Sequence, residues 1–182
     1  MVEGGAQGDR AVFLDRDGVL VVPEFRDGRS FAPRRIADFR LYEEAAPCLE
    51  RMKTAGFRLV VVTNQPDVGN GLVERAVIEE MHHRLATALP VDAIEVCYHV
   101  PTDNCDCRKP KPGMLRRAAG RLGLDCARSI MIGDRGSDVA AGRAAGCRTI
   151  FIDLGYREEQ PDRPDWRVDC LSDATDIVLG WG

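Results

Sequence analysis

The stretch AVFLDRDGVL, residues 11–20, joins a short apolar run to two aspartates and a glycine. Its first four residues have the length and composition of a buried strand. Asp15 and Asp17 are two positions apart, so an extended backbone would place both carboxylates on one face. Gly18 lets the chain bend there without steric cost. A strand that delivers acids into a turn is typical of a ligand site at the edge of a sheet.

Apolar runs of strand length recur along the chain and alternate with helical patterns, which indicates βαβ units around a parallel sheet. The runs are AVFL (11–14), FRLVVV (57–62), AIEVCY (93–98), SIMI (129–132) and RTIFI (148–152). The helical patterns span 43–55, 73–88, 113–122, 137–145 and 172–179. Gly56, Gly123 and Gly146 stand where helix C-caps are needed. We therefore expect an α/β fold in a single domain over residues 1–182.

Composition and charge narrow the class of protein. The 182 residues are 45% hydrophobic and 30% charged, which is typical of a globular chain. No apolar run approaches the roughly 18 residues that cross a bilayer, so no membrane association is expected. The net charge of −4, without a broad basic stripe, argues against a nucleic-acid partner. Residues 1–9 are glycine-rich and lack the pattern of a secretory signal, which predicts a flexible tail and a cytoplasmic location.

Polar side chains follow three of the apolar runs. Asp15 follows the first run, Thr63-Asn64-Gln65 ends the second, and Asp134 follows the fourth. Parallel strands bring their carboxyl ends to one edge, where ligands bind in open α/β sheets. A turn or a helix cap would explain any one of these positions equally well. The joint arrival of acids, a hydroxyl and a lysine, Lys109, favours a functional site.

These residue types permit phosphoryl transfer. A carboxylate such as Asp15 can attack phosphorus, and a second acid such as Asp17 can protonate the leaving oxygen and then activate water. Two carboxylates beside a phosphate need a cation, and Mg²⁺ with Asp134 as a further ligand meets that need. Thr63 and Lys109 can hold the phosphoryl oxygens and stabilise the charge that develops on them.

The ordered set FLDRDG (13–18), VVTNQ (61–65), CRKP (107–110) and IGDRGSD (132–138) resembles the motifs of the haloacid dehalogenase-like phosphatases. The resemblance spans most of the chain and is far more specific than any single motif. It implies a Rossmann-like three-layer sandwich with a central parallel sheet, a core without a cap domain, and Mg²⁺-dependent hydrolysis of phosphomonoesters.

The same resemblance implies roles for individual residues. Asp15 is the expected nucleophile and Asp17 the expected general acid and base, while Thr63 and Lys109 would bind the transferring phosphoryl group. The Mg²⁺ ligands would be Asp15, the backbone carbonyl of Asp17 and Asp134. Asp138 matches a further acid of the last motif, which often supports the loop. The residues expected to contact substrate are Arg16, Asn64, Gln65 and Arg108.

Four of the chain's metal-ligating side chains cluster in CYHVPTDNCDCRKP, residues 97–110. Cys97, His99, Cys105 and Cys107 form the Cys₃His set of a closed tetrahedral zinc site, which should be structural. A redox pair is disfavoured because no C-x-x-C is present. The pattern C-x-H-x5-C-x-C followed by RKP resembles a branch of the family that contains D-glycero-D-manno-heptose 1,7-bisphosphate 7-phosphatases and histidinol-phosphatases, both with a zinc-binding loop.

The substrates of these two enzymes differ in charge, since one carries a second phosphate and the other an amine. The segment PEFRDGRSFAPRRIADFR, residues 23–40, has five arginines against three acids. That excess, with Arg108 beside Lys109, favours a phosphorylated sugar. Histidinol phosphate stays open, because the Cys–His loop is short and PDVGN follows TNQ. Two further alternatives are a non-catalytic zinc-stabilised phosphate-binding module and a nucleic-acid 3′-phosphatase, the latter disfavoured by the acidic balance. A monomer is expected.

Overall fold

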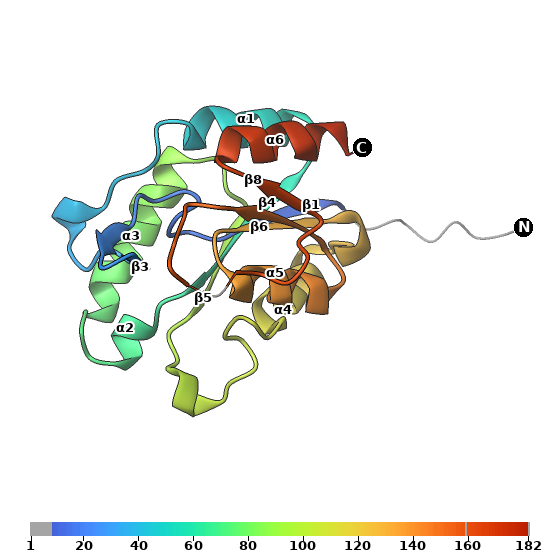
Figure 1. Ribbon diagram of the computed structural model, residues 1–182. Coiled ribbons are helices and arrows are strands. Elements are labelled where there is room, and N and C mark those ends of the chain that lie inside the picture. The colour runs from blue at the N-terminus through green and yellow to red at the C-terminus, as the bar shows by residue number, and fades with distance from the viewer. Residues whose placement is uncertain (1–8, 159, 182) are drawn as a thin grey trace, which may run out of the picture.

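The computed structural model describes residues 9–158 and 160–181. Its centre is a parallel sheet of six strands in the order β5-β4-β1-β6-β7-β8 (Figure 1). The strands are β1 (Ala11–Leu14), β4 (Arg58–Asn64), β5 (Ala93–Cys97), β6 (Ile130–Gly133), β7 (Arg148–Ile152) and β8 (Trp166–Val168). The five neighbouring pairs are all parallel, as the nearly continuous apolar runs predicted.

Helices cover both faces of this sheet, which makes the three-layer sandwich (Figure 1). The longer helices are α1 (Ala45–Thr54), α3 (Arg75–Ala88), α4 (Gly113–Leu122), α5 (Gly136–Ala145) and α6 (Leu171–Gly180). Alternate residues of β1 point to opposite layers. Val12 and Leu14 pack with α1, α3 and α6, whereas Phe13 packs with α4 and α5. The expected α/β class is therefore confirmed.

The strand order places three strand ends side by side. The chain leaves β1 at the centre of the sheet, builds β4 and β5 on one side, and returns to build β6, β7 and β8 on the other. Leu14, the last residue of β1, is level with Val61 of β4 and Ile132 of β6. The segments that follow these three residues therefore meet at the carboxyl edge, at the point where the strand order reverses.

Two pieces of β structure were not predicted. β8 is a three-residue edge strand that extends the sheet beyond β7. The antiparallel hairpin of β2 (Glu24–Arg26) and β3 (Arg29–Phe31) lies between β1 and α1 in the chain. Its two-residue turn is Asp27-Gly28, with φ of 51° and 77°, and positive φ at both positions matches the twist of the flanking strands. The Asp-Gly pair is the local sequence signal for this hairpin.

The short elements and the first residues complete the description. α2 (Pro66–Gly69) and three 3₁₀ turns (Ile36–Asp38, Pro101–Asp103 and Cys126–Arg128) occupy loops. The tail expected at residues 1–9 lies outside the described residues except for Asp9, which bridges to Leu124 and is part of the fold. In the part of the chain described here, no helix is long and apolar enough to span a membrane.

Candidate active site

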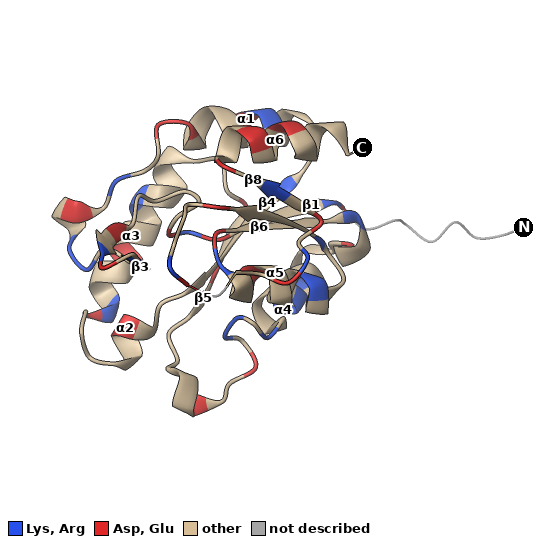
Figure 2. Cartoon of the chain, viewed as in Figure 1, with Lys and Arg blue, Asp and Glu red and all other residues tan. Residues whose placement is uncertain are grey.

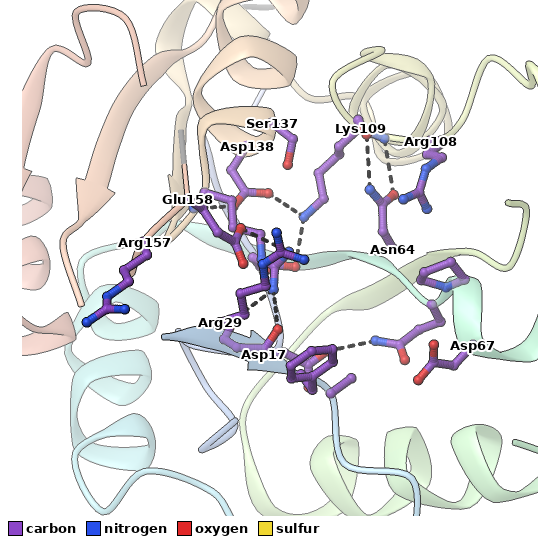
Figure 3. Close-up of a pocket in the computed structure, with 17 residues that line it drawn as sticks. Asp17, Arg29, Asn64, Asp67, Arg108, Lys109, Ser137, Asp138, Arg157 and Glu158 are labelled. Atoms are coloured by element: carbon purple, nitrogen blue, oxygen red, sulfur yellow. Dashed lines mark hydrogen bonds and ion pairs between the residues drawn. The ribbon is translucent and has the colours of Figure 1, made fainter. Parts of the chain in front are cut away.

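A cavity of about 650 Å³ opens at the carboxyl edge of the sheet, where the three strand ends meet (Figure 3). Its walls come from six segments: the turn after β1, the β2–β3 hairpin, the turn after β4, the loop of residues 97–110 (the zinc loop, which carries the predicted zinc ligands), the start of α5 and the loop after β7. The cavity thus gathers residues that lie far apart in the sequence, from Asp15 to Glu158.

Three buried acids lie together beside this cavity, and two of them, Asp15 and Asp138, line it. Carboxylate oxygens of Asp15, Asp134 and Asp138 all fall within 4.8 Å of one another. Burial, and then repulsion by Asp15 and Asp138, raise the pKa of Asp134 well above its ordinary range. Neither oxygen of Asp134 has a hydrogen-bond partner among the described residues. A hard divalent cation would satisfy these oxygens, so the donor set fits Mg²⁺.

Gly18 makes the approach to this acid cluster possible. Its φ is +92°, a conformation that a residue with a side chain rarely adopts. A Cβ at this position would lie 2.0 Å from Asp134 Oδ2. The turn after β1 can therefore pass directly over Asp134 only with glycine there.

Lys109 reaches the acid cluster from the opposite wall. Its Nζ lies 2.7 Å from Asp15 Oδ1, 2.6 Å from Asp138 Oδ1 and 2.7 Å from the carbonyl oxygen of Val62. Burial opposes the ammonium charge, but attraction by Asp138 and Asp15 outweighs it and raises the pKa of Lys109. Burial raises the pKa of Asp138 to about 6 despite this ammonium. Asp138 also accepts a hydrogen bond from the Arg135 backbone, so it both supports the loop and belongs to the cluster.

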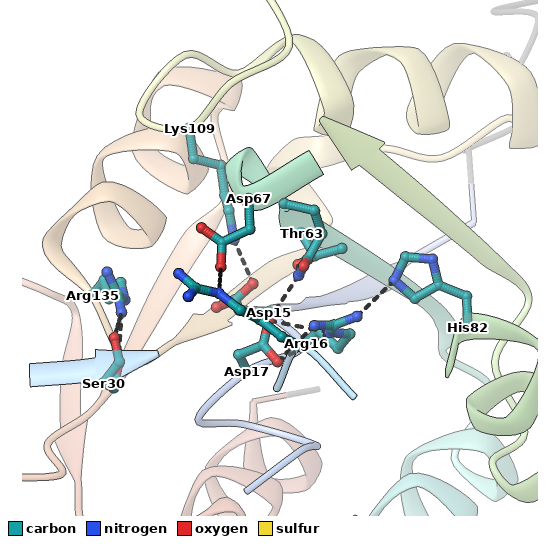
Figure 4. A network of polar contacts seen from close by, with 11 residues as sticks. Asp15, Arg16, Asp17, Ser30, Thr63, Asp67, His82, Lys109 and Arg135 are labelled. Atoms are coloured by element: carbon teal, nitrogen blue, oxygen red, sulfur yellow. Dashed lines mark hydrogen bonds and ion pairs between the residues drawn. The ribbon is translucent and has the colours of Figure 1, made fainter. Parts of the chain in front are cut away.

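Asp17 is held from behind by Arg16. The guanidinium donates to both carboxylate oxygens of Asp17, at 2.9 to 3.1 Å. Arg16 is fully buried and is not among the residues that line the cavity. Arg16 was expected to contact substrate, and the structure turns its side-chain donors toward Asp17 and His82 (Figure 4).

His82 completes this row of contacts. Its Nε2 lies 3.1 Å from Arg16 Nη1, and burial, with repulsion by Arg16, lowers the pKa of His82 to about 3. The neutral ring can accept a hydrogen bond from the guanidinium. The two adjacent histidines of α3 differ in burial, since His82 is buried while His83 is exposed.

The strand end Thr63-Asn64-Gln65 organises other site residues. Gln65 Nε2 donates to Asp17 Oδ2 at 2.8 Å and to Thr63 Oγ1 at 2.9 Å. Thr63 is buried and does not line the cavity, although it was predicted to bind the phosphoryl group directly. The structure brings Thr63 to the site through Gln65, whose own Oε1 is buried without a partner among the described residues.

Asn64 links this strand end to the zinc loop. Its Oδ1 accepts from the Lys109 backbone N–H at 3.1 Å, and its Nδ2 donates to the Lys109 carbonyl at 3.1 Å. The side-chain amide was predicted to contact substrate. It lies at the cavity wall, but this reciprocal pair commits it to fixing the backbone of Lys109.

The predicted zinc ligands converge. The sulfurs of Cys97, Cys105 and Cys107 are 3.2 to 3.7 Å apart, and His99 Nδ1 lies 3.6 and 3.3 Å from the sulfurs of Cys97 and Cys107. A zinc–sulfur bond of about 2.3 Å implies tetrahedral edges of about 3.8 Å between sulfurs. Four soft or borderline donors at near this spacing fit a closed Zn²⁺ site.

The zinc loop carries Arg108 directly. Arg108 Nη1 donates to the carbonyl oxygen of His99 at 3.3 Å, and Arg108 lines the cavity beside Lys109. The backbone of His99, a predicted zinc ligand, thus supports the Arg108 guanidinium, and Cys107, another predicted ligand, immediately precedes Arg108 in the chain. Arg108 therefore lies at the cavity, with most of its donors available to a ligand.

Known proteins share this chain's sequence and fold. A family model described as HAD-hydrolase-like matches residues 106–174. D-glycero-beta-D-manno-heptose-1,7-bisphosphate 7-phosphatase of Pseudomonas aeruginosa is 34% identical over 149 residues, covering 79% of this chain and 81% of that protein. The enzyme of the same name from Escherichia coli K12 is 33% identical over 183 residues, covering 92% and 93%.

A solved structure agrees with these relatives. The D,D-heptose 1,7-bisphosphate phosphatase of B. bronchiseptica, complexed with magnesium and phosphate, superposes with a TM-score of 0.81 and 28% identity. The match covers 95% of this chain and 99% of that one. The resemblance drawn from the sequence motifs is thereby confirmed over nearly the whole fold.

Proposed function

This chain belongs to the haloacid dehalogenase-like phosphatases, in the family of the heptose-bisphosphate phosphatases, and on that premise we propose that it removes the 7-phosphate of D-glycero-D-manno-heptose 1,7-bisphosphate. The observation that carries the proposal is the buried cluster in which Lys109 joins Asp15 and Asp138 beside Asp134. Such a cluster matches what phosphoryl transfer from a dianionic ester needs: a nucleophile, a cation site and a fixed positive charge.

Asp15 is the proposed nucleophile. Its Oδ1 accepts from Lys109, and its carboxylate lines the cavity. One oxygen attacks the phosphorus, the bond from phosphorus to the ester oxygen breaks, and an aspartyl-phosphate forms. Lys109 stays protonated throughout, because its pKa is raised, and its ammonium stabilises charge on the transferring group.

Asp17 is the proposed general acid and base. It delivers a proton to the departing ester oxygen and later takes one from the water that attacks the aspartyl-phosphate, which frees Asp15 and releases inorganic phosphate. Arg16 and Gln65 fix the orientation of its carboxylate. Thr63 positions Gln65 and, through it, Asp17.

Mg²⁺ would be held by Asp15 and Asp134, with Asp138 beside them and the Asp17 carbonyl as a further donor. When bound, the ion would neutralise the carboxylates and the phosphate oxygens so that an anionic ester can approach. Zn²⁺ would be held by the Cys₃His set and, having no open position, would order the loop that carries Arg108 and Lys109.

The charge of the cavity supports a phosphorylated sugar over histidinol phosphate. Arg29, Arg108 and Arg157 line it without an acidic partner among the described residues, whereas the acids Asp67 and Glu158 are paired to arginines. An amine would meet repulsion there. Basic and acidic residues are interspersed over the visible chain (Figure 2), which supports the proposal that nucleic acid is not a partner.

We further propose one catalytic domain, a monomer, and a reducing cytoplasmic setting. All seven cysteines lie within the described residues and are free, and three of them must be thiolates to bind zinc.

A kinetic comparison tests this function. Phosphate release should require Mg²⁺, and kcat/KM should be larger for one anomer of heptose 1,7-bisphosphate than for histidinol phosphate. A larger kcat/KM for histidinol phosphate than for either anomer would overturn the substrate assignment. No Mg²⁺-dependent release from any phosphomonoester would instead favour a non-catalytic phosphate-binding module.

A further inference from the structure

The β2–β3 hairpin forms a wall of the active-site cavity. Arg29, Ser30 and Phe31, all of β3, line it together with the acids of the proposed catalytic site. In the view of Figure 3, Arg29 lies on the opposite side of the cavity from Arg108. A substrate whose phosphate rests at Asp15 would therefore extend between these two arginines.

Two segments fix the hairpin in place: Arg135, which follows the acid Asp134, and the loop that carries Arg157. Arg135 Nη2 donates to the Ser30 carbonyl at 2.8 Å and to the Ser30 hydroxyl at 2.6 Å. At the turn, the Arg157 backbone N–H donates to the Gly28 carbonyl at 2.9 Å. A Cβ on Gly28 would lie 2.8 Å from Arg157 Cδ, so the two segments pack closely. These contacts hold Arg29 at a set distance from the acid cluster.

Arg29 differs from Arg26, Arg34 and Arg35 in having no side-chain partner among the described residues. Arg26 pairs with Glu24 at 2.9 Å, Arg34 with Asp67 at 2.6 Å and Arg35 with Asp38 at 2.6 Å. No ion pair or side-chain hydrogen bond to another described residue involves Arg29, although five donors sit on its guanidinium. In the segment 23–40 it is the arginine that both lines the active-site cavity and is free to bind a ligand.

The charge balance of the cavity points to the same ligand class. Lys109 carries one positive charge against the two carboxylates of Asp15 and Asp138, so the acid cluster still needs a cation, while Arg34 offsets Asp67. Arg29 lies outside these pairs, so its positive charge at the cavity wall is available to an anionic ligand. A guanidinium binds phosphate with two parallel hydrogen bonds, a geometry that an ammonium cannot reproduce.

We propose that Arg29 is a specificity-determining residue that binds a second phosphate group of the substrate, at the end remote from the bond that is cleaved. The inference rests on the proposed phosphatase function and deepens it, because it assigns one residue to the phosphate that is not cleaved. Because the hairpin is held in place, the distance from Arg29 to Asp15 would determine how far apart the two phosphates of a substrate can be.

The test compares Arg29→Ala on heptose 1,7-bisphosphate and on heptose 7-phosphate, which lacks the second phosphate. We expect kcat/KM for the bisphosphate to fall about tenfold or more, mainly through KM, and the value for the monophosphate to fall less than about threefold. Arg29→Lys should recover part of the loss. Arg26→Ala removes the same charge from the same hairpin at a paired position, and should not discriminate between the substrates.

Equal losses on both substrates in Arg29→Ala would overturn the assignment, since they would mean a general disturbance of the hairpin. Equal discrimination by Arg26→Ala would also overturn it, because net charge alone would then explain the effect. A wild-type protein that releases phosphate from neither substrate would contradict the phosphatase function itself. An inactive wild-type protein can be told apart from the two variant outcomes, because those can be measured only when the wild type is active.

Discussion

Two groups of metal-ligating side chains lie near the same end of the sheet, and they differ in chemistry and in completeness. The Cys₃His group has four mutually close donors and a loop wrapped around it. The carboxylate group has three buried acids, with both oxygens of Asp134 unpartnered among the described residues and with Asp15 facing a cavity. The closed group can hold only a structural ion, whereas the open group leaves room for substrate.

The two groups are nevertheless connected through one residue, Lys109. Lys109 comes two residues after the predicted zinc ligand Cys107, and its Nζ lies between Asp15 and Asp138. Asn64 ties the backbone of Lys109 to β4. The proposed function thus implies a division of labour: the zinc group would set the position of the cationic side chains, and the carboxylate group would take part in the chemistry.

Removal of the nucleophile should have the largest effect. Asp15→Asn keeps the size of the side chain but removes its nucleophilic oxygen, so we expect phosphate release to fall by at least about 10³-fold. Steady-state release with saturating Mg²⁺ measures this. Asp67→Asn is the control, because Asp67 lines the same cavity outside the metal group, and its loss should stay within about tenfold. Comparable losses in both variants would mean that the cavity's charge, not a nucleophile, drives release.

Damage to the zinc group should come next. Cys105→Ser removes one of four ligands, so the protein should lose its zinc, melt at a lower temperature and lose about ten- to a hundredfold in activity. Metal analysis and thermal unfolding measure the first two effects. Cys170→Ser matches it as a half-buried cysteine outside the group, at the N-cap of α6, where serine is favourable. Full activity in a zinc-free Cys105→Ser protein would show that the carboxylate group does not depend on the zinc group.

The link itself should contribute a smaller effect. Asn64→Ala removes both bonds to the Lys109 backbone, and we expect about tenfold lower kcat with zinc still bound, because the ammonium is less well placed. Asn70→Ala, an exposed amide in the same connection, is the control. Zinc loss in Asn64→Ala, or an unchanged kcat, would show that Asn64 does not couple the two groups.

The smallest effect should lie outside both groups, at His82. Its pKa is about 3 when folded and 6.5 ordinarily, so the unfolded chain binds the extra proton as pH falls from 6.5 towards 3. Stability is then lost on acidification across that window, by at most about 1.4 kcal/mol per pH unit. His82→Gln should show a shallower decline in unfolding free energy from pH 6.5 to about 4 than the wild type. An identical slope in both proteins would mean that His82 is not a buried neutral group.

Much of this arrangement could be predicted from the sequence. The five predicted strand runs correspond to β1, β4, β5, β6 and β7 to within about two residues at each end, and the strand-end acids do meet at one edge. Ligand spacing was enough to predict that the Cys₃His donors converge, since four soft or borderline donors so close together in sequence rarely arise by chance. Apolar continuity and motif spacing are local properties, which is why they could be recognised.

What the sequence did not predict depends on contacts between distant segments. Arg16 lies between two aspartates in the sequence, which suggested that it contacts substrate. Its guanidinium instead contacts His82, 66 positions away. Asn64 is bound to the backbone of Lys109, 45 positions away. Arg34 is neutralised by Asp67, which lies far from it in the sequence. That Arg29 is available to a ligand can be seen only when the ion pairs of the nearby arginines are known. Side-chain partners of this kind are decided by packing, not by spacing.

The division of labour between the two metal groups has one direct test. Zinc is removed from the purified protein with a thiol-reactive mercurial and a chelator, the reagents are cleared with excess thiol, and Mg²⁺-dependent phosphate release is followed as metals are returned. We predict that release is lost with zinc, is not restored by Mg²⁺ alone, and returns with one equivalent of Zn²⁺ per chain. Full release from zinc-free protein supplied only with Mg²⁺ would contradict the account.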